Sequence, residues 1–179
     1  MQIVIRSWNC RGAAVALLVL GIFAANAVTP AAAASCTRWT ASVQEDEGGP
    51  AMTATVCAND AGGAPALVLQ CGAPLDLRYD LGDKAGDLEP GITAKFTFTA
   101  GTASLTRQLD LEAMDNMFTT ELAPGDALLA MLQSGHEVSI ADAAGKYGAS
   151  RFSLDGSRAA IAKVKASCHA PAADAADDD

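Results

Sequence analysis

The stretch that decides the fold reads CTRWTASVQEDEGGPAMTATVC and spans residues 36–57. On both sides of its acidic, glycine-rich centre, apolar side chains stand at every second position: Trp39, Ala41, Val43, Met52, Ala54 and Val56. Alternation with a period of two is typical of a half-buried strand, and a glycine-proline cluster between two such runs favours a hairpin. The sequence therefore predicts two antiparallel strands joined across residues 45–50.

The register of this hairpin predicts a disulfide bond. If residues 38–44 face residues 51–57 across the turn, the numbers of opposed residues add up to about 95. Cys36 then lies within a residue or two of Cys57 on the partner strand. Because disulfide-bonded residues have Cα atoms within about 7 Å of each other, this pair can form a bond.

Cys71 does not reach Cys57 by the same reasoning. A second hairpin that closes over residues 58–65 places Cys71 opposite Met52. Cys57 is then several residues away, and each residue of a strand adds about 3.4 Å. Of the three pairings that four cysteines allow, we therefore expect the hairpin pair together with a bond from Cys71 to Cys168.

The rest of the chain predicts more strands than helices. Alternating runs, interrupted by glycine, proline and aspartate, indicate strands at residues 66–70, 75–79, 92–99, 104–111, 137–141 and 150–154. Between residues 112 and 120 the pattern weakens, and either a turn of helix or a strand fits it. We expect a β-rich α+β domain: an antiparallel sheet or β-sandwich with two helices, the C-terminal one packed on the sheet.

Two segments have the spacing and end signals of helices. Residues 127–133 follow Asp126, and Gly135 stands where a helix often ends. The second helix begins near Ser157, which we expect to be its N-cap. Its apolar residues at positions i, i+3 and i+7 share one face: Ile161, Val164 and Cys168. Cys168 is therefore expected to point inward.

The first 34 residues resemble a secretory signal that is cleaved. A basic start holds Arg6 and Arg11, residues 13–28 are apolar, and a run of small residues ends at Ala34. The apolar run of about 16 residues is shorter than the ~20 that cross a bilayer as a helix, so a retained anchor is the less favoured interpretation. We expect residues 1–34 to be a signal peptide.

A lipoprotein is a competing interpretation, because Cys36 follows two alanines and a serine. Ala33, however, stands three residues earlier, where a lipidation site prefers a larger aliphatic residue. Cleavage after residue 34 leaves a single disulfide-stabilised domain at residues 35–169. Residues 170–179 have nothing to bury and end in charge, so we expect them to be a disordered acidic tail.

Charge and cysteine content limit the function. Removal of residues 1–34 leaves 10 Lys and Arg against 21 Asp and Glu, a net charge of −11. Such a surface argues against binding to nucleic acid and to anionic lipid. The four remaining cysteines are an even number and predict two disulfides formed in an oxidising compartment, the periplasm or the exterior. They contain no C-x-x-C pair, so zinc is not expected.

One loop carries four carboxylates within ten residues: Asp80, Asp83, Asp87 and Glu89. Carboxylate oxygens are the ligands that Ca²⁺ prefers. The spacing matches no EF-hand, however, and clusters of aspartate and glycine are common in plain turns. We assign no metal ligand to this loop, and calcium binding stays an open alternative.

No group of residues indicates an active site. Ser157 lacks the G-x-S-x-G pattern of a nucleophile elbow, and the two histidines, His136 and His169, are expected at exposed positions. If all four cysteines of the domain are oxidised, no thiol nucleophile remains. A paired-carboxylate hydrolase stays open, but nothing singles out a pair. We assign no catalytic or cofactor-binding residue, and Trp39 is expected in the core.

Several segments resemble a group of small exported bacterial proteins that includes the invasion-associated locus B family and the accessory protein VasI of type VI secretion. The segments are the early Trp39, the strand LVLQC at residues 67–71, the helix-glycine-strand unit at 128–140, and FSLDGS at 152–157 followed by a helix and Cys168. The likeness covers most of residues 36–168. It implies an envelope-resident, β-sandwich-like domain that acts by contact, and it brings no catalytic residue with it.

We therefore expect a periplasmic or secreted, non-enzymatic domain that acts through contacts with an unidentified protein or envelope component. No nucleic acid is expected as a partner, and no membrane span after signal cleavage. The alternative is a periplasmic inhibitor of a basic enzyme such as lysozyme, because opposite charges steer two proteins together and speed their association.

Overall fold

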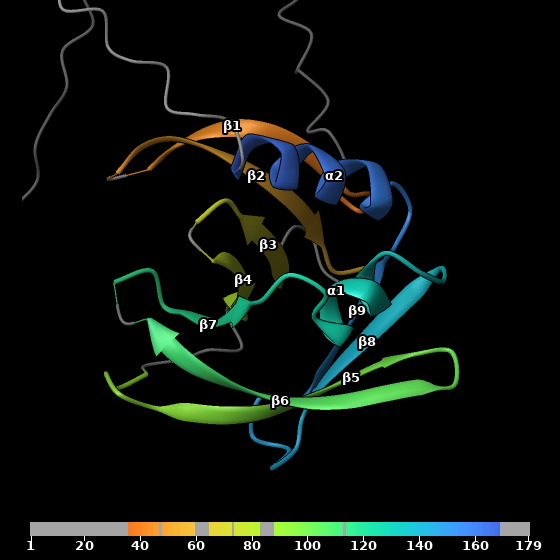
Figure 1. Cartoon of the computed structure of the whole chain (residues 1–179). Helices are drawn as coiled ribbons and strands as arrows, with labels where there is room; N and C mark the ends of the chain where they lie inside the picture. The colour runs from red at the N-terminus through yellow and green to blue at the C-terminus, as the bar shows by residue number, and fades with distance from the viewer. Residues whose placement is uncertain are drawn as a thin grey trace, which may run out of the picture. The chain divides into compact units, whose positions relative to one another are not determined.

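The computed structural model describes residues 36–46, 48–59, 65–72, 74–82, 88–112 and 114–168 (Figure 1). The predicted signal peptide at 1–34, the predicted tail at 170–179 and His169 lie outside the described residues, as do Asp83 and Asp87 of the acidic loop. Neither helix within these ranges has the length and apolar character needed to cross a membrane.

The structure consists of an antiparallel sheet and two helices. The strands are β1 (Thr40–Asp46), β2 (Gly49–Cys57), β3 (Ala66–Gln70), β4 (Leu75–Asp80), β5 (Thr93–Ala100), β6 (Ala103–Glu112), β7 (Met117–Leu122), β8 (Glu137–Asp142) and β9 (Ala149–Ser153), and the helices are α1 (Ala127–Leu132) and α2 (Ser157–Cys168). Their order in the sheet is β1-β2-β3-β4-β7-β6-β5-β8-β9, with antiparallel neighbours throughout. This confirms the predicted β-rich fold with two helices.

The first hairpin has the expected register. Thr40 faces Thr55 and the pairing continues to the turn, so opposed residue numbers add up to 95. The N–H of Cys71 donates to the carbonyl of Met52 at 3.2 Å, as the second hairpin predicts. The structure accordingly contains the Cys36–Cys57 bond, with Cα atoms 5.1 Å apart, and the Cys71–Cys168 bond, with Cα atoms 5.3 Å apart.

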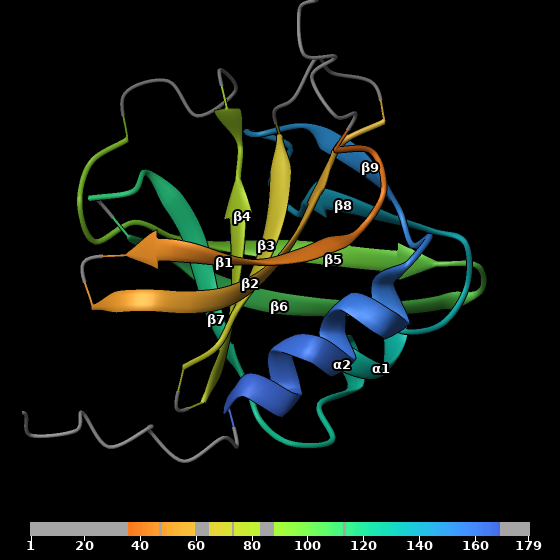
Figure 2. The same cartoon turned by 90° about the horizontal axis from the view of Figure 1, so that it is seen from above.

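The sheet curls until its far end meets its beginning. Ala58, directly after β2, forms a bridge with Phe152 of β9, and the N–H of Asn59 donates to the carbonyl of Arg151 at 2.8 Å. In Figure 2, β3 and β4 cross β5 and β6 steeply, as two parts of one curled sheet. The core lies inside this curve.

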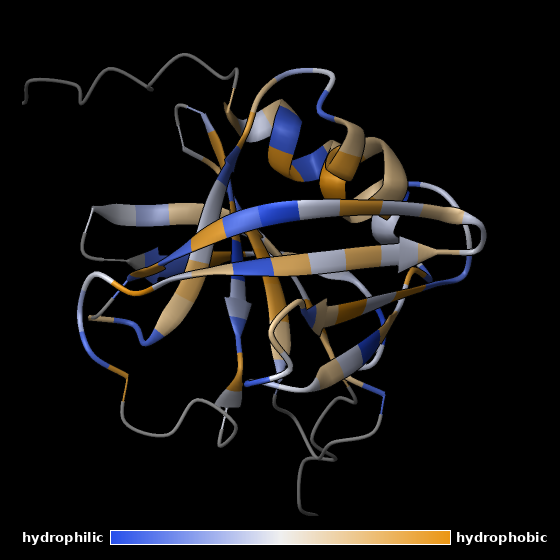
Figure 3. Cartoon of the chain, turned by 90° about the horizontal axis from the view of Figure 1, so that it is seen from below, coloured by the Kyte–Doolittle hydropathy of each residue, from blue (hydrophilic) through white to orange (hydrophobic). Residues whose placement is uncertain are grey.

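Aromatic side chains fill the core. The rings of Tyr79 and Phe96 meet edge to face at 5.3 Å, and those of Phe96 and Phe118 at 5.1 Å. Such pairs add to the free energy gained by burying their area. Figure 3 shows hydrophilic and hydrophobic residues alternating along β5 and β6, which lie in front in that view. Trp39 is 3% exposed and belongs to the core, as predicted.

The two helices cover different parts of the sheet. Helix α2 packs on β1 and β2 with Ala160, Ile161 and Val164 buried (Figure 1). Helix α1 buries Leu128 and Leu132 completely. The predicted packing of the C-terminal helix on the sheet is therefore confirmed.

The structure decides one segment that the sequence left open and corrects one expected N-cap. Residues 117–122 form β7, so the strand is the correct interpretation of that ambiguous segment. Ser157 as N-cap is wrong: the N–H of Ala160 donates to the carbonyl of Gly156 at 3.0 Å, and the residue whose carbonyl accepts the first helical bond is the N-cap. Gly156 takes that place with φ +80°, and Ser157 is the first helical residue.

Candidate functional site

The Cys36–Cys57 bond lies at the start of the described domain, and the Cys71–Cys168 bond holds its last described residue. Cys57 is buried, whereas Cys71 and Cys168 are half-buried, and Cys168 lines an apolar groove of about 370 Å³. The groove also contains Leu122 and Leu129 from the core. All four sulfur atoms are bonded, so none of these cysteines is a thiol in this structure.

The acidic loop is described only in part. Asp80 is described, and its Oδ1 accepts the N–H of Gly82 at 2.7 Å, as an aspartate that stabilises a turn does. Glu89 is exposed. Because Asp83 and Asp87 lie outside the described residues, calcium binding by this loop stays an open alternative.

A groove of about 580 Å³ beside the start of α2 brings Ser157, His136 and Asp155 to one place. In a Ser-His-acid site the hydroxyl, imidazole and carboxylate are joined by hydrogen bonds. Within the described part of the chain, no hydrogen bond joins any two of these three side chains. The geometry of a nucleophilic triad is therefore not formed.

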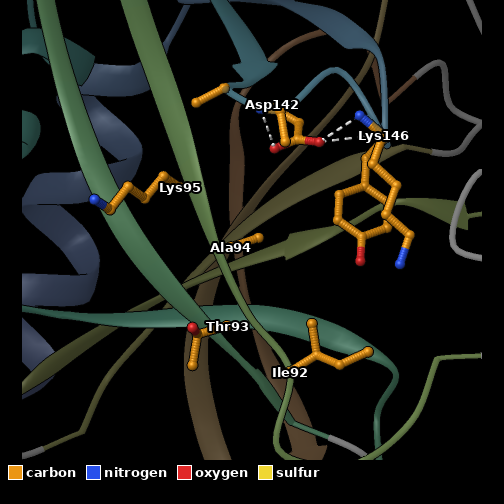
Figure 4. Close-up of a pocket in the computed structure, with 9 residues that line it drawn as sticks. Ile92, Thr93, Ala94, Lys95, Asp142 and Lys146 are labelled. Atoms are coloured by element: carbon orange, nitrogen blue, oxygen red, sulfur yellow. Dashed lines mark hydrogen bonds between the residues drawn. The ribbon is translucent and has the colours of Figure 1, made fainter.

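A second hollow, of about 460 Å³, lies between the start of β5 and the turn from β8 to β9 (Figure 4). Asp142 in its wall is 7% exposed. Its Oδ1 accepts the N–H of Ala144 at 3.1 Å, and its Oδ2 accepts those of Lys146 at 2.6 Å and Tyr147 at 3.2 Å. In Figure 4 the Lys95 side chain extends away from Asp142. Both carboxylate oxygens thus hold the turn, which is a structural task.

The outer face of β4, β7 and β6 has a different character. On each strand the buried residues lie on one face, and they include Leu77 and Tyr79 on β4, Phe118 and Leu122 on β7, and Leu109 and Leu111 on β6. The residues that alternate with this face point away from the core. Those outward positions and the β6–β7 turn carry carboxylates: Asp76, Asp80, Asp110, Glu112, Asp115 and Glu121. We call this set the acidic face.

The cation on the acidic face is Arg78. Its Nε lies 2.8 Å from Oδ2 of Asp76, and its Nη1 lies 2.8 Å from Oδ2 of Asp115. Partial burial by itself lowers the pKa of Arg78. Together, the hydrogen bond and charge of Asp76 and the nearby charges of Glu112 and Asp115 outweigh that effect and raise the pKa above its ordinary value. Arg78 therefore stays charged and balances only part of the negative charge around it.

Register places like charges directly opposite each other on this face. Asp76 of β4 faces Glu121 of β7, and like charges in such a position destabilise a sheet. Glu121 is exposed and has no salt bridge within the described ranges. Asp76 is ion-paired with Arg78, so Glu121 is the member of this pair whose charge no described cation balances, and we regard the acidic face as a candidate contact surface.

No protein family model, curated protein or solved structure matches this chain. The resemblance to small exported bacterial proteins stays a prediction, and the candidate surface is argued from its geometry alone.

Sequence reasoning missed the acidic face. The i, i+2 spacing of Asp76 with Arg78, and of Asp110 with Glu112, was visible in the chain. Whether these pairs lie on one surface depends on β7 lying between β4 and β6. That strand order is a property of the folded sheet, and the local pattern does not indicate it.

Proposed function

We propose that this protein is an exported, non-catalytic domain that acts by binding a protein or a component of the cell envelope, and that the acidic face is its contact surface. The observation that carries the proposal is the like-charge pair Asp76–Glu121, with Glu121 exposed and without a salt bridge. Like charges opposite each other are unfavourable, and because, of this pair, Arg78 balances only Asp76, a basic partner supplies the counter-charge that Glu121 lacks.

The two disulfide bonds support the export part of the proposal. Disulfides form and persist in oxidising compartments and are rare where glutathione keeps thiols reduced. In this domain one bond fixes the first hairpin, and the other ties the end of α2 to the residue after β3. A periplasmic or secreted location therefore agrees with the way the fold is stabilised.

The charge of the surface sets the chemistry of the partner. A face rich in carboxylates steers a basic partner toward it and raises the rate of association, an effect that falls as salt is added. Such a partner presents lysine and arginine side chains. A basic enzyme such as lysozyme has this property, so inhibition of such an enzyme is the second candidate function.

The test compares two variants with equal changes in charge. Glu112→Gln/Glu121→Gln removes two carboxylates from the acidic face, and Glu137→Gln/Asp155→Asn removes two exposed carboxylates elsewhere. The disulfide-bonded protein is immobilised, and binding of a basic lysozyme and of a solubilised envelope extract is measured at low and high salt. An exposed charge pair is worth about 0.2–1 kcal/mol, so the first variant should weaken binding by about 2- to 30-fold while the second leaves it nearly unchanged.

The outcomes separate the two candidates. Salt-sensitive binding of lysozyme together with slower cell-wall hydrolysis supports the inhibitor. Salt-sensitive capture from the extract, lost in the first variant and kept in the second, supports an envelope contact. Equal binding by both variants would show that the acidic face is not the contact surface.

A further inference from the structure

The outer edge of β1 is open. Among the described strands, β1 comes first in the order and pairs with β2 alone. The sheet closes without it, because Ala58, directly after β2, forms the bridge to Phe152 of β9. In Figure 1, β1 lies at the outer border of the described part of the chain, with no described strand beyond it. Such an edge presents backbone N–H and C=O groups that another strand can bind.

The contacts of β2 show which backbone groups of β1 lie on this edge. Met52 faces Val43, and its carbonyl accepts the N–H of Cys71 on the side of β2 that is turned away from β1. Pro50 faces Glu45 and has no N–H to donate. In an antiparallel pair, residues that exchange hydrogen bonds alternate with residues that do not. Val43 and Glu45 therefore do not bond to β2, and their N–H and C=O groups point to the open edge.

Ala41 belongs to the same set. The N–H of Trp39, two residues earlier, also points away from β2 and donates to the carbonyl of Asp155 at 3.0 Å. The N–H and C=O groups of Ala41, Val43 and Glu45 have no hydrogen-bond partner within the described part of the chain. The middle of β1 is therefore a strand edge whose backbone groups are free to bind.

A second copy of β1 satisfies all of these groups at once. In an antiparallel pair related by twofold symmetry, a residue on the axis faces its own copy, and the residues on either side form reciprocal pairs. With Val43 on the axis, Ala41 of each copy faces Glu45 of the other. Each facing pair exchanges both of its hydrogen bonds, and Glu45 does not face a like charge.

The side chains favour the same register. Val43 is 59% exposed and is, with Met114, one of the two exposed large hydrophobic residues in the described part of the chain. When it faces its own copy, apolar surface is buried on both chains, and such cross-strand pairs stabilise a sheet. A register centred on Ser42 instead places Glu45 opposite Trp39, whose N–H is already bonded. The geometry therefore selects Val43 as the centre.

The two ends of β1 have complementary charge. Arg38 precedes the strand, is exposed and forms no salt bridge with a described carboxylate. The other end leads into the acidic turn, whose residues 45–47 are Glu-Asp-Glu. Antiparallel pairing brings the acidic end of each copy toward the basic end of the other. This reciprocal attraction favours a second copy of the chain as the occupant of the edge.

We propose that β1 binds the β1 edge of a second copy of this chain, antiparallel and centred on Val43, so that the two sheets join across a symmetric dimer. Each copy contributes one strand of seven residues, and the contact is smaller than the interfaces of permanent dimers. The dimer therefore dissociates on dilution. This inference goes beyond the proposed function and does not use the acidic face.

Sedimentation equilibrium of the disulfide-bonded protein measures the dimer, and amide hydrogen exchange locates the contact. The amides of Ala41, Val43 and Glu45 should exchange more slowly as the protein concentration rises, because they are hydrogen-bonded only in the dimer. The amides of Ser42 and Gln44 point toward β2, so their exchange should not depend on concentration.

Charge at position 43 tests the register. Val43→Lys places two ammonium groups opposite each other and should weaken dimerisation about fivefold or more. Met114→Lys makes a matched change at the other exposed hydrophobic residue and should leave dimerisation unchanged. Val43→Glu alone should also weaken it. An equal mixture of the Val43→Lys and Val43→Glu proteins should dimerise more strongly than either variant alone, because opposite charges then face each other.

Four results would overturn the proposal. One is a protein that stays monomeric at its highest soluble concentration, and another is equal weakening by Val43→Lys and Met114→Lys. The third is a mixture of the two position-43 variants that dimerises no better than either alone. The fourth is protection of the Val43 amide only after an envelope extract is added, which would assign the edge to a strand of another protein. The carboxylates of the acidic face take no part, so the proposed function stands or fails separately.

Discussion

Arg107 and Asp126 form an ion pair that fastens the start of α1 to β6. Nη2 of Arg107 lies 2.7 Å from Oδ1 and 2.8 Å from Oδ2 of Asp126. The same Oδ1 accepts the N–H of Leu128 at 2.8 Å, so Asp126 is also the N-cap of the helix. Helix α1 has only six residues, and helices of that length do not form alone in water. Its stability therefore depends on this carboxylate and on the burial of its leucines.

Replacement of Asp126 should destabilise the domain, and Asp126→Ala should do so more than Asp126→Asn. Asp126→Asn keeps an oxygen for the cap but loses the ion pair, whereas Asp126→Ala loses both and leaves the partly buried Arg107 without its carboxylate. Loss of a cap costs about 1 kcal/mol and loss of one partner of a buried pair up to about 3–5 kcal/mol, so we expect about 2–4 kcal/mol for Asp126→Ala and less for Asp126→Asn. Urea unfolding measures both. The free energy of unfolding of Asp110→Asn, an exposed control, should stay within about 0.5 kcal/mol of the wild-type value. An equal loss in all three variants would contradict a stabilising role for the Arg107–Asp126 ion pair and the N-cap.

Asp142 should matter for stability because three N–H groups donate to its carboxylate. Asp142→Ala leaves these donors without an acceptor beside the buried Tyr147, although residues 143–146 of the turn are exposed. Each such loss costs about 1–3 kcal/mol when water does not replace it. We expect a loss of about 2–4 kcal/mol, with Asp142→Asn intermediate because one oxygen remains. Thermal unfolding measures the difference. Unchanged stability of Asp142→Ala would contradict a structural role for the Asp142 carboxylate in the hollow of Figure 4.

The sequence was sufficient wherever short loops connect neighbouring strands. Cys36 and Cys57 lie at the two ends of one hairpin, so alternation and turn length fixed their register. The approach of Cys71 to Met52 followed from the next hairpin in the same way. These contacts are local, and local pattern carries the information that they need.

The sequence was insufficient where strands distant in the chain pair with each other. Asp76 meets Glu121 across 45 residues, and alternation on either strand does not say which strand will be its neighbour. Core packing decides that order, because Tyr79, Phe96 and Phe118 must come together inside the curved sheet. The acidic face depends on that order and therefore required the structure.

The start of α2 shows a second limit of sequence reasoning. Serine is among the most common N-cap residues, which favoured Ser157. Gly156 takes the place because its φ of +80° turns the chain from β9 into the helix, and because a side chain there would collide with the carbonyl oxygen of Trp39, 2.9 Å from the Cβ position. The frequency with which serine occurs at N-cap positions carries no information about this contact.

That contact makes Gly156→Ala a specific test of the helix start. The substitution forces alanine into a left-handed conformation, which costs about 1–2 kcal/mol, and it also displaces the backbone at Trp39. Gly145→Ala is the matched control, since Gly145 has φ +74° and nothing within 4 Å of its Cβ position. We expect Gly156→Ala to lose at least about 1 kcal/mol more than Gly145→Ala. Equal losses in urea unfolding would mean that the backbone at Trp39 moves aside without cost.

The two disulfides should contribute unequally to stability. The Cys71–Cys168 bond closes a separation of 97 residues and the Cys36–Cys57 bond one of 21. On the chain-entropy model a crosslink restricts the unfolded chain more as the loop grows, which gives about 4–5 kcal/mol for the first bond and about 3 kcal/mol for the second. Urea unfolding of Cys71→Ala/Cys168→Ala and of Cys36→Ala/Cys57→Ala measures each loss, and non-reducing peptide mapping of the wild type verifies the pairing. The long-range pair should be the more damaging to lose, because without it the end of α2 is no longer bonded to the residue after β3. A larger loss from the hairpin variant, or a Cys57–Cys71 peptide in the map, would contradict this account.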